Sequence, residues 1–385
     1  MFYNIHVDAI ERLTLLSNQM EHEPSEGAGI AETAEDCRNV FVYRAHLPNG
    51  KRIRLLKTLL SSVCENDCAY CPFRAGRDFR RASLQPDEYA LLVSRLHQAG
   101  IIDGAFISSG MIGGGVRTQE RLLNCAELLR KKYGFQGYLH LKLMPGTQFA
   151  QVECSMQLAD RVSLNLEAPT AARLLCYTEQ KNFVSELWQP LAWVEQIRTQ
   201  QPAHKGWKGH WPSSSTQFVM GGAGECDQEL LQVSQTLYRQ LNLKRAYYSP
   251  FTPHEDTPLE NQPPAPYKRE QRLYQASFLI RDYHYSWQDL QYDQQGNLPL
   301  DQDPKLAWAE THLLHRPVEI NRAGREELLH IPGIGPRGAD RILQARRVQS
   351  IHDISQLAKL GVQVKRCEKY LLLQGRRPIR QPSLW

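Results

Sequence analysis

Three cysteines, Cys64, Cys68 and Cys71, form a C-x3-C-x2-C pattern in the segment LLSSVCENDCAYCPFR. The pattern directly follows an apolar run that is typical of a β-strand. Proteins of the α/β class place their chemistry in loops at the carboxyl ends of parallel strands. Three thiolates at this spacing can hold three of the four irons of a 4Fe–4S cluster. The fourth iron then stays open to a cofactor that binds metal directly.

A structural zinc site is the alternative for the same cysteines. Such a site normally has a fourth Cys or His ligand close by. After the loop, however, the next cysteine is Cys125, and the next histidine is His97 on a predicted helix. The other cysteines lie far apart, and each is expected to be a small buried apolar side chain. The pattern therefore favours an iron–sulfur cluster with one open iron.

A second pattern with chemical meaning is the segment INRAGREELLHIPGIGPRGADRILQARR. A short helix is predicted to end near Ile331, and a turn that contains Gly333, Ile334 and Gly335 leads into a longer amphipathic helix. Backbone amides at the start of that helix can face one phosphate, helped by the helix dipole. Such contacts touch the nucleic-acid backbone, so they give affinity without sequence choice. A degenerate second hairpin, with its turn at residues 361–363, is predicted to complete a paired unit.

The positive charge of the chain is concentrated around this second pattern. Residues 318–385 contain 13 Lys or Arg and 6 Asp or Glu, a formal charge of +7 in a chain whose net charge is +5. Residues 1–317 therefore carry −2. This asymmetry is typical of a separate module that binds polyanions. Arg337 and Arg341 are the candidate phosphate contacts on its longer helix, and docking of a protein is the alternative role.

Strands and helices alternate six times between the two patterns. Such alternation implies parallel pairing with right-handed crossovers, in a partial barrel or an open sheet. The predicted strands are 54–63, 104–110, 137–144, 161–168, 216–222 and 244–250. The predicted helices are 86–99, 118–133, 148–159, 183–200 and 226–241, with an earlier amphipathic helix at 7–20. A Glu/Gly-rich segment at 22–36 is typical of a loop.

The order of these elements predicts four parts. A Pro-rich stretch at 250–266 and a helical, aromatic segment separate the six-strand series from the basic module. We assign 1–50 to an N-terminal helical and loop extension, 51–250 to the six-strand series, 251–315 to a Pro-rich and helical extension, and 316–385 to the basic module.

The predicted strand RVSLNLEA has one polar face. Its valine and leucines alternate with Ser163, Asn165 and Glu167, and alternate side chains of a strand share a face. Burying unpaired polar groups is costly, so this face must look into a ligand cavity or a hydrated barrel interior. GYLHLKLM shows the same alternation with His140 and Lys142.

Together these features resemble a known superfamily. A C-x3-C-x-aromatic-C pattern, with Tyr70 as the aromatic residue, after the first strand of a six-fold β/α series is similar to the radical S-adenosylmethionine superfamily, over about residues 50–250. The resemblance implies a partial (β/α)6 barrel and a 4Fe–4S cluster on the three cysteines, with S-adenosylmethionine bound to the cluster. One-electron reduction would release a 5′-deoxyadenosyl radical that abstracts a substrate hydrogen. An electron donor such as a flavodoxin or a ferredoxin is then an expected partner.

The resemblance also implies contacts with the cofactor outside the cysteines. In the superfamily, strand four contacts the ribose or methionine part, which assigns Asn165 and Glu167 here; a capped strand end is the alternative. The turn after strand two receives the cofactor amino group. In this chain Ser108, Ser109 and Gly110 stand at that turn, without the acidic residue of the superfamily. Tyr70 and the glycine turn at 221–225 complete the candidate contacts.

A closer resemblance covers nearly the whole chain. RLLKTLLSSVCENDCAYCPFR, FISSG, GYLHLKLMPG, RVSLNLEAPT and LYQASFLIRDY are similar to a sequence-defined family of DNA modification or repair radical proteins with a terminal helix-hairpin-helix. This resemblance implies a radical enzyme that acts on a nucleotide in DNA, with a small all-α domain that grips the DNA backbone. Two alternatives stay open. One is a cluster-bearing, nucleic-acid-binding scaffold without radical chemistry. The other is a radical enzyme that acts on RNA or protein and uses the terminal domain as a tether.

The composition favours a folded cytoplasmic protein. The chain is 42% hydrophobic and 23% charged, with no long low-complexity tract. No apolar run approaches the roughly 18 residues of a membrane helix, and the N-terminus lacks the apolar core of a signal peptide. Nine cysteines with one tight cluster indicate metal or redox chemistry in a reducing compartment. We therefore predict a cytoplasmic location and no membrane partner.

Overall fold

The structure, a computed structural model, describes residues 3–20, 35–37, 40–46 and 52–378. The chain divides into a barrel unit (residues 1–225 and 236–266) and a terminal unit (226–235 and 267–385). The Pro-rich stretch up to Pro266 thus belongs to the barrel unit, and the segment from Tyr267 onwards belongs to the terminal unit. The middle part expected at 251–315 is divided between the two. Most of the Glu/Gly-rich segment at 22–36 lies outside the described residues.

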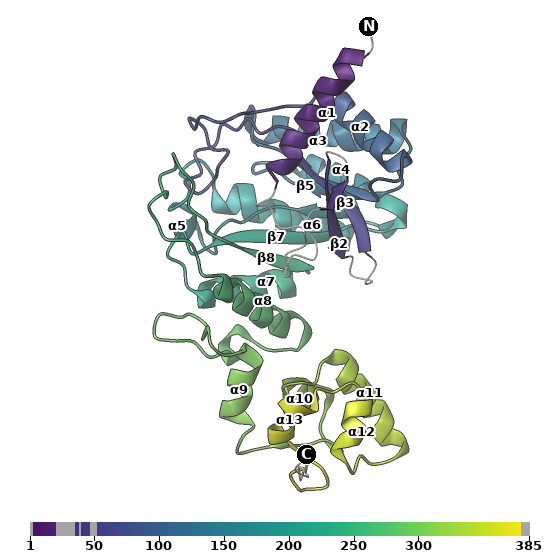
Figure 1. Cartoon of the computed structure of the whole chain (residues 1–385), viewed down its shortest axis with the longest axis vertical. Coiled ribbons are helices and arrows are strands. Elements are labelled where there is room, and N and C mark those ends of the chain that lie inside the picture. The colour runs from purple at the N-terminus through teal and green to yellow at the C-terminus, as the bar shows by residue number, and fades with distance from the viewer. Residues whose placement is uncertain (1–2, 21–34, 38–39, 47–51, 379–385) are drawn as a thin grey trace. The chain divides into compact units, whose positions relative to one another are not determined.

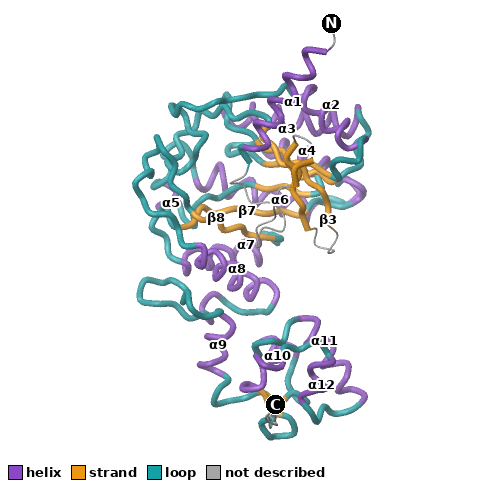
Figure 2. The backbone as a smooth tube through the Cα atoms, viewed as in Figure 1, coloured by secondary structure: helices purple, strands orange, loops and turns teal. Residues whose placement is uncertain are grey.

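An eight-stranded sheet lies at the centre of the barrel unit (Figures 1 and 2). The strand order follows the chain from β1 to β8, with antiparallel pairing up to β3 and parallel pairing from β3 to β8. The strands are β1 (Glu35–Cys37), β2 (Val40–His46), β3 (Arg52–Leu59), β4 (Gly104–Ser108), β5 (Tyr138–Lys142), β6 (Arg161–Ser163), β7 (Ser213–Met220) and β8 (Arg245–Pro250). All six predicted strands are present and parallel, so the fold is an α/β partial (β/α)6 barrel. The antiparallel β1 and β2 were not predicted.

Helices connect the successive parallel strands, close to where the sequence places them. They are α2 (Pro86–Gln98), α3 (Gly114–Glu127), α4 (Phe149–Leu158), α5 (Ala171–Leu174), α6 (Gln189–Gln200) and α7 (Asp227–Gln240), while α1 (Tyr3–Asn18) precedes the sheet. Short π-helical turns η1 (Leu128–Lys132) and η2 (Phe183–Trp188) and 3-10 turns η3 (Ala203–Lys205) and η4 (Trp207–Gly209) complete the connections. The α7 helix contributes residues to both units.

The two faces of the parallel sheet differ sharply in chemistry. Pairing aligns Lys57, Phe106, His140 and Arg161 in one row across β3 to β6. The neighbouring row on the other face is fully buried and apolar, as in Leu56, Ala105, Leu139. The apolar face supplies the core because burying hydrocarbon is the main stabilising contribution to folding. The polar face is left for chemistry, as the alternation in the sequence predicts.

The terminal unit is mainly helical (Figure 2). Its elements are α8 (Tyr267–Asp282), η5 (Trp287–Asp289), α9 (Pro304–His312), β9 (Val318–Glu319), α10 (Arg325–His330), α11 (Pro336–Val348), α12 (Ile354–Lys359), α13 (Val364–Cys367), η6 (Glu368–Tyr370) and β10 (Leu371–Leu372). The short strands β9 and β10 pair in parallel. An apolar cluster that includes Leu328, Leu329, Ile331, Ile342 and Leu357 forms its core.

Candidate active site and nucleic-acid interface

The loop that carries the three cysteines follows β3 directly, as predicted. Backbone hydrogen bonds fasten it to its neighbours: the Glu65 amide donates to the Met111 carbonyl (2.9 Å), and the Ala69 amide donates to the Tyr177 carbonyl (2.7 Å). A side chain at position 110 is excluded, because a Cβ there would lie 2.2 Å from the Val63 carbonyl oxygen. The loop is therefore held by the segments that follow β4 and α5.

Each of the three thiols has a nitrogen donor beside it. The Met111 amide donates to Cys64 Sγ (3.4 Å), and the Phe73 amide donates to Cys71 Sγ (3.4 Å). The Lys181 ammonium interacts electrostatically with Cys68. Hydrogen bonds to sulfur favour the thiolate and tune the potential of an iron–sulfur cluster. The donor set therefore fits three cluster ligands.

Electrostatics in the loop depend on burial and on Lys181. Burial raises the pKa of Cys68, and the Lys181 ammonium opposes this rise. Burial and the charge of Cys68 raise the pKa of Cys71. Burial alone would lower the pKa of Lys181, but the negative charges of Cys68 and Glu167 outweigh it, so this pKa is raised. Lys181 is thus a permanent cation beside the thiols.

The three thiols of the loop are not gathered around one position that a single metal ion could occupy. Within the described residues, no group of three or more His, Cys, Asp or Glu side chains is arranged to hold one metal ion. A 4Fe–4S cluster makes a different demand, because each thiolate binds a different iron. Outside the loop, Cys125 and Cys367 are buried as expected, but Cys154 and Cys176 are exposed, so the expectation of a buried apolar side chain was wrong for these two.

Glu167 is the most unusual residue near the cysteine loop. Its backbone φ is +64°, in the left-handed region that residues other than glycine rarely adopt. Its Oε1 lies 3.5 Å from Lys181 Nζ, and its Oε2 is buried without a hydrogen-bond partner among the described residues. A buried oxygen of this kind calls for a donor.

Tyr70 packs between the cysteine loop and the segment after β6. Its ring meets that of Tyr177 edge to face, with centroids 4.9 Å apart. Burial, followed by the charges of Glu167 and Cys68, raises the pKa of Tyr70 well above its usual value. The hydroxyl therefore stays protonated and can donate to an acceptor.

Asn165 and Glu167 lie beyond β6, which ends at Ser163 and not at residue 168 as predicted. The Thr216 hydroxyl interrupts the ladder: it donates to the Leu164 carbonyl (2.8 Å) and accepts from the Leu166 amide (3.2 Å). Regular pairing is lost there, and Glu167 rejoins β7 through a single bridge to Phe218. Asn165 Oδ1 accepts a hydrogen bond from Lys142 Nζ (2.6 Å).

In the turn after β4, several polar groups make hydrogen bonds within the protein and are not open to a ligand. Ser108 is buried, the Ser109 hydroxyl donates to the Gly110 carbonyl (2.8 Å), and the Gly110 amide donates to the Ser61 carbonyl (2.7 Å). The amides of Gly113 and Gly114, which follow, are used by the Glu65 carboxylate at 3.0 and 2.6 Å. Part of the glycine-rich segment thus binds the cysteine loop itself.

The backbone groups of the second glycine turn, after β7, are also hydrogen-bonded to side chains of the protein. The Glu225 carboxylate accepts hydrogen bonds from the amides of Gly221 and Ala223. Gln262, in the Pro-rich stretch, donates to the carbonyls of Gly221 and Gly222 at 3.2 Å. The Pro-rich stretch is therefore part of the barrel unit and not a passive linker.

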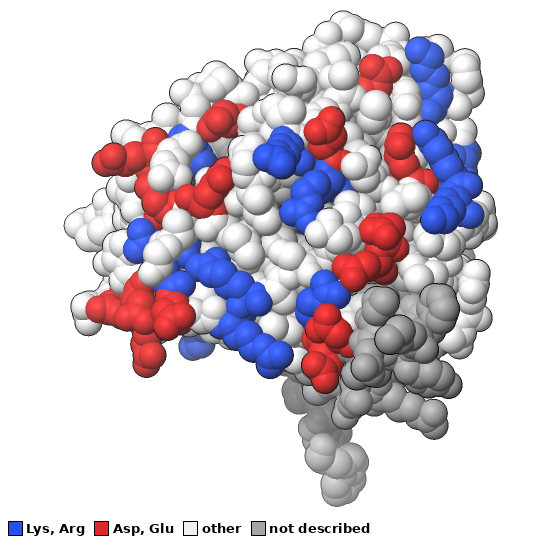
Figure 3. Space-filling view, turned by 90° about the horizontal axis from the view of Figure 1, so that it is seen from above, with Lys and Arg blue, Asp and Glu red and all other residues white. Residues whose placement is uncertain are grey.

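Arginines after the cysteines stabilise the loop instead of forming a helix face. Arg81 donates four hydrogen bonds to backbone carbonyls, including those of Ser62 and Arg74. Arg77 donates to the carbonyls of Pro72 (3.0 Å) and Glu255 (2.7 Å). On one face of the molecule, shown in Figure 3, basic and acidic side chains are interspersed.

The hairpin pattern forms two helix–turn–helix pairs in the terminal unit. The first joins α10 to α11 through residues 331–335, with Gly333 at φ +85° and Gly335 at the N-terminus of α11. The second joins α12 to α13, and its Gln363 amide donates to the Gly333 carbonyl (3.0 Å). A side chain at Gly333 would meet the Gln363 carbonyl at 2.6 Å. The two turns therefore pack directly together, as the sequence predicts for a paired unit.

The candidate phosphate contacts Arg337 and Arg341 are exposed on α11. Arg341 Nη1 donates to the Leu360 carbonyl (3.2 Å), so this side chain bridges the two turns. Ile334 is buried and anchors the first turn in the core. Gly335 and Arg337 thus lie at the surface end of α11, where amides lack an intrahelical acceptor.

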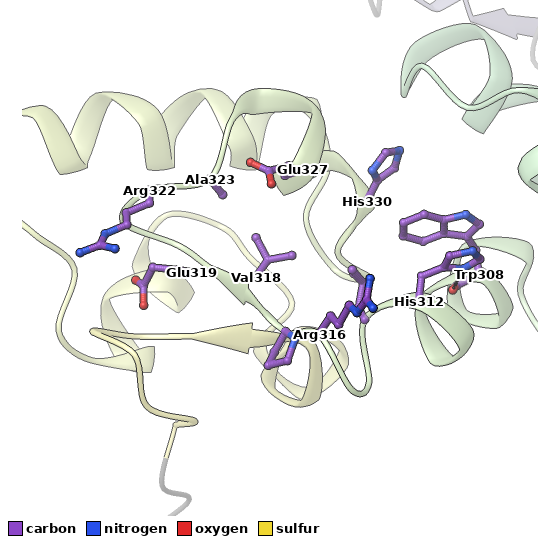
Figure 4. Close-up of a pocket in the computed structure, with 11 residues that line it drawn as sticks. Trp308, His312, Arg316, Val318, Glu319, Arg322, Ala323, Glu327 and His330 are labelled. Carbon is purple, nitrogen blue, oxygen red and sulfur yellow. Dashed lines mark hydrogen bonds between the residues drawn. The ribbon is translucent and has the colours of Figure 1, made fainter.

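A cavity of about 610 Å³ lies elsewhere in the terminal unit (Figure 4). The rings of Trp308 and His312 stack in it, with centroids 4.4 Å apart and planes 10° apart. Its acidic side chains already accept backbone amides: Glu327 from Gly324 (2.7 Å), and Glu319 from Gly375 (2.7 Å). The cavity was not predicted from the sequence.

Two functional candidates were missed in the sequence. Lys181 lies in the long connection between β6 and β7, and Glu65 lies within the cysteine loop. Neither belongs to a periodic pattern. Only the position of Glu65 one residue after Cys64 could have drawn attention to it.

No family model matches the chain, and no curated protein matches it. Solved structures are similar in part. Methylornithine synthase (PylB) gives a TM-score of 0.47 at 11% identity, over 72% of this chain and 67% of that one. The FeFe-hydrogenase maturase HydG from Carboxydothermus hydrogenoformans gives 0.44 at 13%, over 59% and 51%. The cobalamin-dependent S-adenosylmethionine radical enzyme OxsB, with aqua-cobalamin bound, gives 0.35 at 11%, over 76% and 45%.

These similarities are weak. The chain spans about half the length of the HydG chains that it matches, and every TM-score is below 0.5. What the chain does must therefore be inferred from its own residues. In the part of the chain that the structure describes, no helix is both long and apolar enough to span a bilayer.

Proposed function

We propose that the chain is a radical S-adenosylmethionine enzyme that acts on a nucleotide in DNA. The observation that carries the proposal is the loop after β3, where backbone amides donate to Cys64 and Cys71 and where Cys68 interacts with Lys181, the ion-pair partner of the buried Glu167 carboxylate. When bound there, a 4Fe–4S cluster and S-adenosylmethionine supply, on one-electron reduction, a 5′-deoxyadenosyl radical that removes a substrate hydrogen.

The residues around the loop have separate roles in this proposal. Cys64, Cys68 and Cys71 would hold the cluster. Glu167 would accept hydrogen bonds from the amino group or the hydroxyls of the cofactor, because its Oε2 needs a donor. Tyr70 and Asn165 would orient the same cofactor from either side of Glu167. Ser108, Ser109 and Gly110 would approach it mainly by shape, since the amide of Gly110 already has an acceptor.

The terminal unit supports a nucleic-acid substrate. Its residues 318–385 carry a formal charge of +7, and its paired turns present the N-terminus of α11 at Gly335. Phosphate groups bind at such helix ends through amides and the helix dipole. Gly333, Ile334, Gly335, Arg337 and Arg341 would form a helix-hairpin-helix contact with the DNA backbone. DNA is favoured over RNA because this contact depends on the shape of the backbone.

The chemistry also needs partners and a compartment. A one-electron donor such as a flavodoxin or a ferredoxin would reduce the cluster. Free thiols and reduction chemistry are compatible with the reducing cytoplasm, which is the location that we propose.

The decisive experiment measures 5′-deoxyadenosine. Protein reconstituted without oxygen is given S-adenosylmethionine and dithionite, with and without a DNA duplex. We expect release that rises with DNA and is lost in Cys64→Ala, Cys68→Ala and Cys71→Ala. Cys154→Ala is the matched control, because it removes an exposed thiol outside the loop. RNA and an unrelated protein replace DNA in parallel reactions, to test the other substrate classes.

The possible outcomes are distinct. No release above the cysteine variants, from wild-type protein with an intact cluster, overturns the radical mechanism and leaves a cluster-bearing scaffold. Release that is stimulated by RNA or protein but not by DNA keeps the radical mechanism and overturns the DNA substrate.

A further inference from the structure

A buried lysine lies behind the turn that precedes α11. Lys305, in the first turn of α9, is only 9% exposed. Its Nζ donates a hydrogen bond of 2.6 Å to the carbonyl oxygen of Ile334. The ammonium has three donors, and the described structure gives it this single acceptor. A buried cation with so little compensation is costly, so its presence needs an explanation.

The surroundings hold Lys305 in this place. Asp303 caps α9 through the amides of Lys305 and Leu306, and Arg366 on α13 forms an ion pair of 2.9 Å with Asp303. The ammonium also lies 4.7 Å from the centre of the Tyr283 ring, a favourable cation–π distance. Asp303, Arg366 and Tyr283 thus surround the lysine and hold it against the Ile334 carbonyl.

The Ile334 carbonyl and the Gly335 amide belong to one peptide group. In a trans peptide the C=O and N–H bonds point in opposite directions. Because the carbonyl points to the buried lysine, the amide of Gly335 points away from it. A cation on the oxygen draws electron density from the peptide group and makes its N–H a stronger donor. Gly335 is the residue at the N-terminus of α11, where an anion is already favoured.

We propose that Lys305 is a positioning residue for phosphate binding, which orients and polarises the Ile334–Gly335 peptide group so that the Gly335 amide binds a nucleic-acid phosphate. This inference rests on the proposed DNA binding by the terminal unit. Lys305 itself does not touch the phosphate. It acts through the peptide group and adds a buried positive charge behind it.

The electrostatic state of Lys305 supports this role. Burial lowers the pKa of Lys305 to about 7, while Asp303 raises it and Arg366 lowers it further. The lysine in turn contributes, after burial, to the lowered pKa of His330. A phosphate at the turn would stabilise the ammonium and raise the pKa of Lys305. Binding of DNA near neutral pH is therefore coupled to uptake of a proton by this residue.

The first test compares the affinity of full-length variants for a fluorescein-labelled DNA duplex, by fluorescence anisotropy. We expect Lys305→Met to weaken binding about fivefold or more, since a buried unit charge close behind a bound phosphate is worth about 1 kcal/mol or more at an effective dielectric constant of about 20. Lys305→Arg keeps the charge, and its affinity should stay close to that of the wild type. Lys131→Met is the matched control, because it removes an exposed lysine of the barrel unit.

The second test measures proton uptake. Titration calorimetry of the duplex, in buffers with different ionisation enthalpies at about pH 7.5, should show net proton uptake by the wild type and none by Lys305→Arg, whose guanidinium stays charged. If circular dichroism shows that Lys305→Met does not fold, this measurement still tests the proposal, because it does not use that variant.

The results separate the two proposals. If the wild type does not bind the duplex, both DNA binding and the role of Lys305 are overturned. If the wild type binds, equal affinity in folded Lys305→Met, or proton uptake that persists in Lys305→Arg, overturns the role of Lys305 alone and leaves DNA binding in place.

Discussion

The carboxylate of Glu167 and the ammonium of Lys181 lie 3.5 Å apart, with side-chain exposures of only 8% and 7%. Such a pair is stable only when hydrogen bonds satisfy the remaining polar atoms. Lys181 also interacts electrostatically with Cys68, whereas Glu167 Oε2 has no hydrogen-bond partner among the residues described. The pair therefore links Cys68 on one side with an open acceptor on the other.

Replacing Lys181 should change the cluster before it changes the fold. Lys181→Met removes a positive charge beside Cys68, which makes it harder to add an electron to a cluster held there. We expect the reduction potential to fall on the order of tens of millivolts, measured by redox titration with electron paramagnetic resonance. Lys131→Met is the exposed control. A potential equal to that of the wild type would contradict the placement of Lys181 against the cluster.

Replacing Glu167 should weaken binding of the cofactor. Glu167→Gln keeps the shape of the side chain but loses the charge that accepts hydrogen bonds from an amino group. We expect about a tenfold loss of affinity for S-adenosylmethionine, as for one charge-assisted hydrogen bond. Equilibrium dialysis of reconstituted protein measures it, with the iron content checked. Glu127→Gln, at a half-exposed ion pair, is the control, and an unaltered affinity in Glu167→Gln argues against the assignment.

Much of the barrel could be predicted because its signals are local. Each parallel strand is a short apolar run, and the alternation in RVSLNLEA and GYLHLKLM marks which face is polar. The strand β6 is shorter than predicted because the Thr216 hydroxyl replaces a ladder hydrogen bond there, a choice that no periodicity records. The strands β1 and β2 pair antiparallel and precede the strand–helix alternation, so this alternation does not predict them.

The candidate site also has a part that local sequence predicts and a part that depends on tertiary contacts. The cysteines lie within eight residues of one another, so their spacing alone predicts a shared site. Lys181 reaches Cys68 across more than a hundred residues of sequence, through the connection after β6. The Glu65 contact with Gly113 and Gly114 is likewise tertiary. The backbone of Glu167, at φ +64°, is a strained feature of the kind found at functional sites, and sequence gives no sign of it.

His140 should make the barrel unit less stable in acid. The ring stacks on Phe106 at 4.1 Å and hydrogen-bonds to the Ser163 hydroxyl (2.8 Å). Burial, followed by the charges of Arg161 and Lys142, lowers the pKa of His140 well below its usual 6.5. Below about pH 6.5 the unfolded chain therefore binds a proton that the folded chain does not, and stability falls as the pH falls.

The test of this pH dependence is the change in melting temperature between about pH 7.5 and 5.5. His140→Gln cannot take up the proton, so it should lose less stability than the wild type over this interval. The difference should be about 1 kcal/mol, one pH unit below the unfolded pKa. The exposed His204 has no such burial, and His204→Gln should follow the wild type. Parallel pH profiles for wild type and His140→Gln would rule out this account.

Arg130 is a buried structural centre of the barrel unit. Its guanidinium donates to the carbonyls of Leu158 (2.9 Å) and Phe135 (2.7 Å), pairs with Asp160 at 2.9 Å, and lies 3.8 Å from the centre of the Trp207 ring. Burial lowers the pKa of Arg130 to about 10, although Asp160 opposes the shift. Burial of the guanidinium therefore costs desolvation free energy, which its many contacts offset.

Arg130→Met should destabilise the barrel unit by about 3–5 kcal/mol, because it removes the ion-pair partner of Asp160 and the buried donor to the carbonyls of Leu158 and Phe135. Arg130→Lys should recover only part of this loss, since one ammonium cannot reproduce the planar fork of the guanidinium. The adjacent Lys131 is the matched control: its ion pair with Glu127 is exposed, and Lys131→Met should cost no more than about 0.5 kcal/mol. Urea unfolding followed by circular dichroism measures all three variants against the wild type. Equal midpoints for Arg130→Met and Lys131→Met would show that the buried network contributes little, contrary to the contacts that surround Arg130.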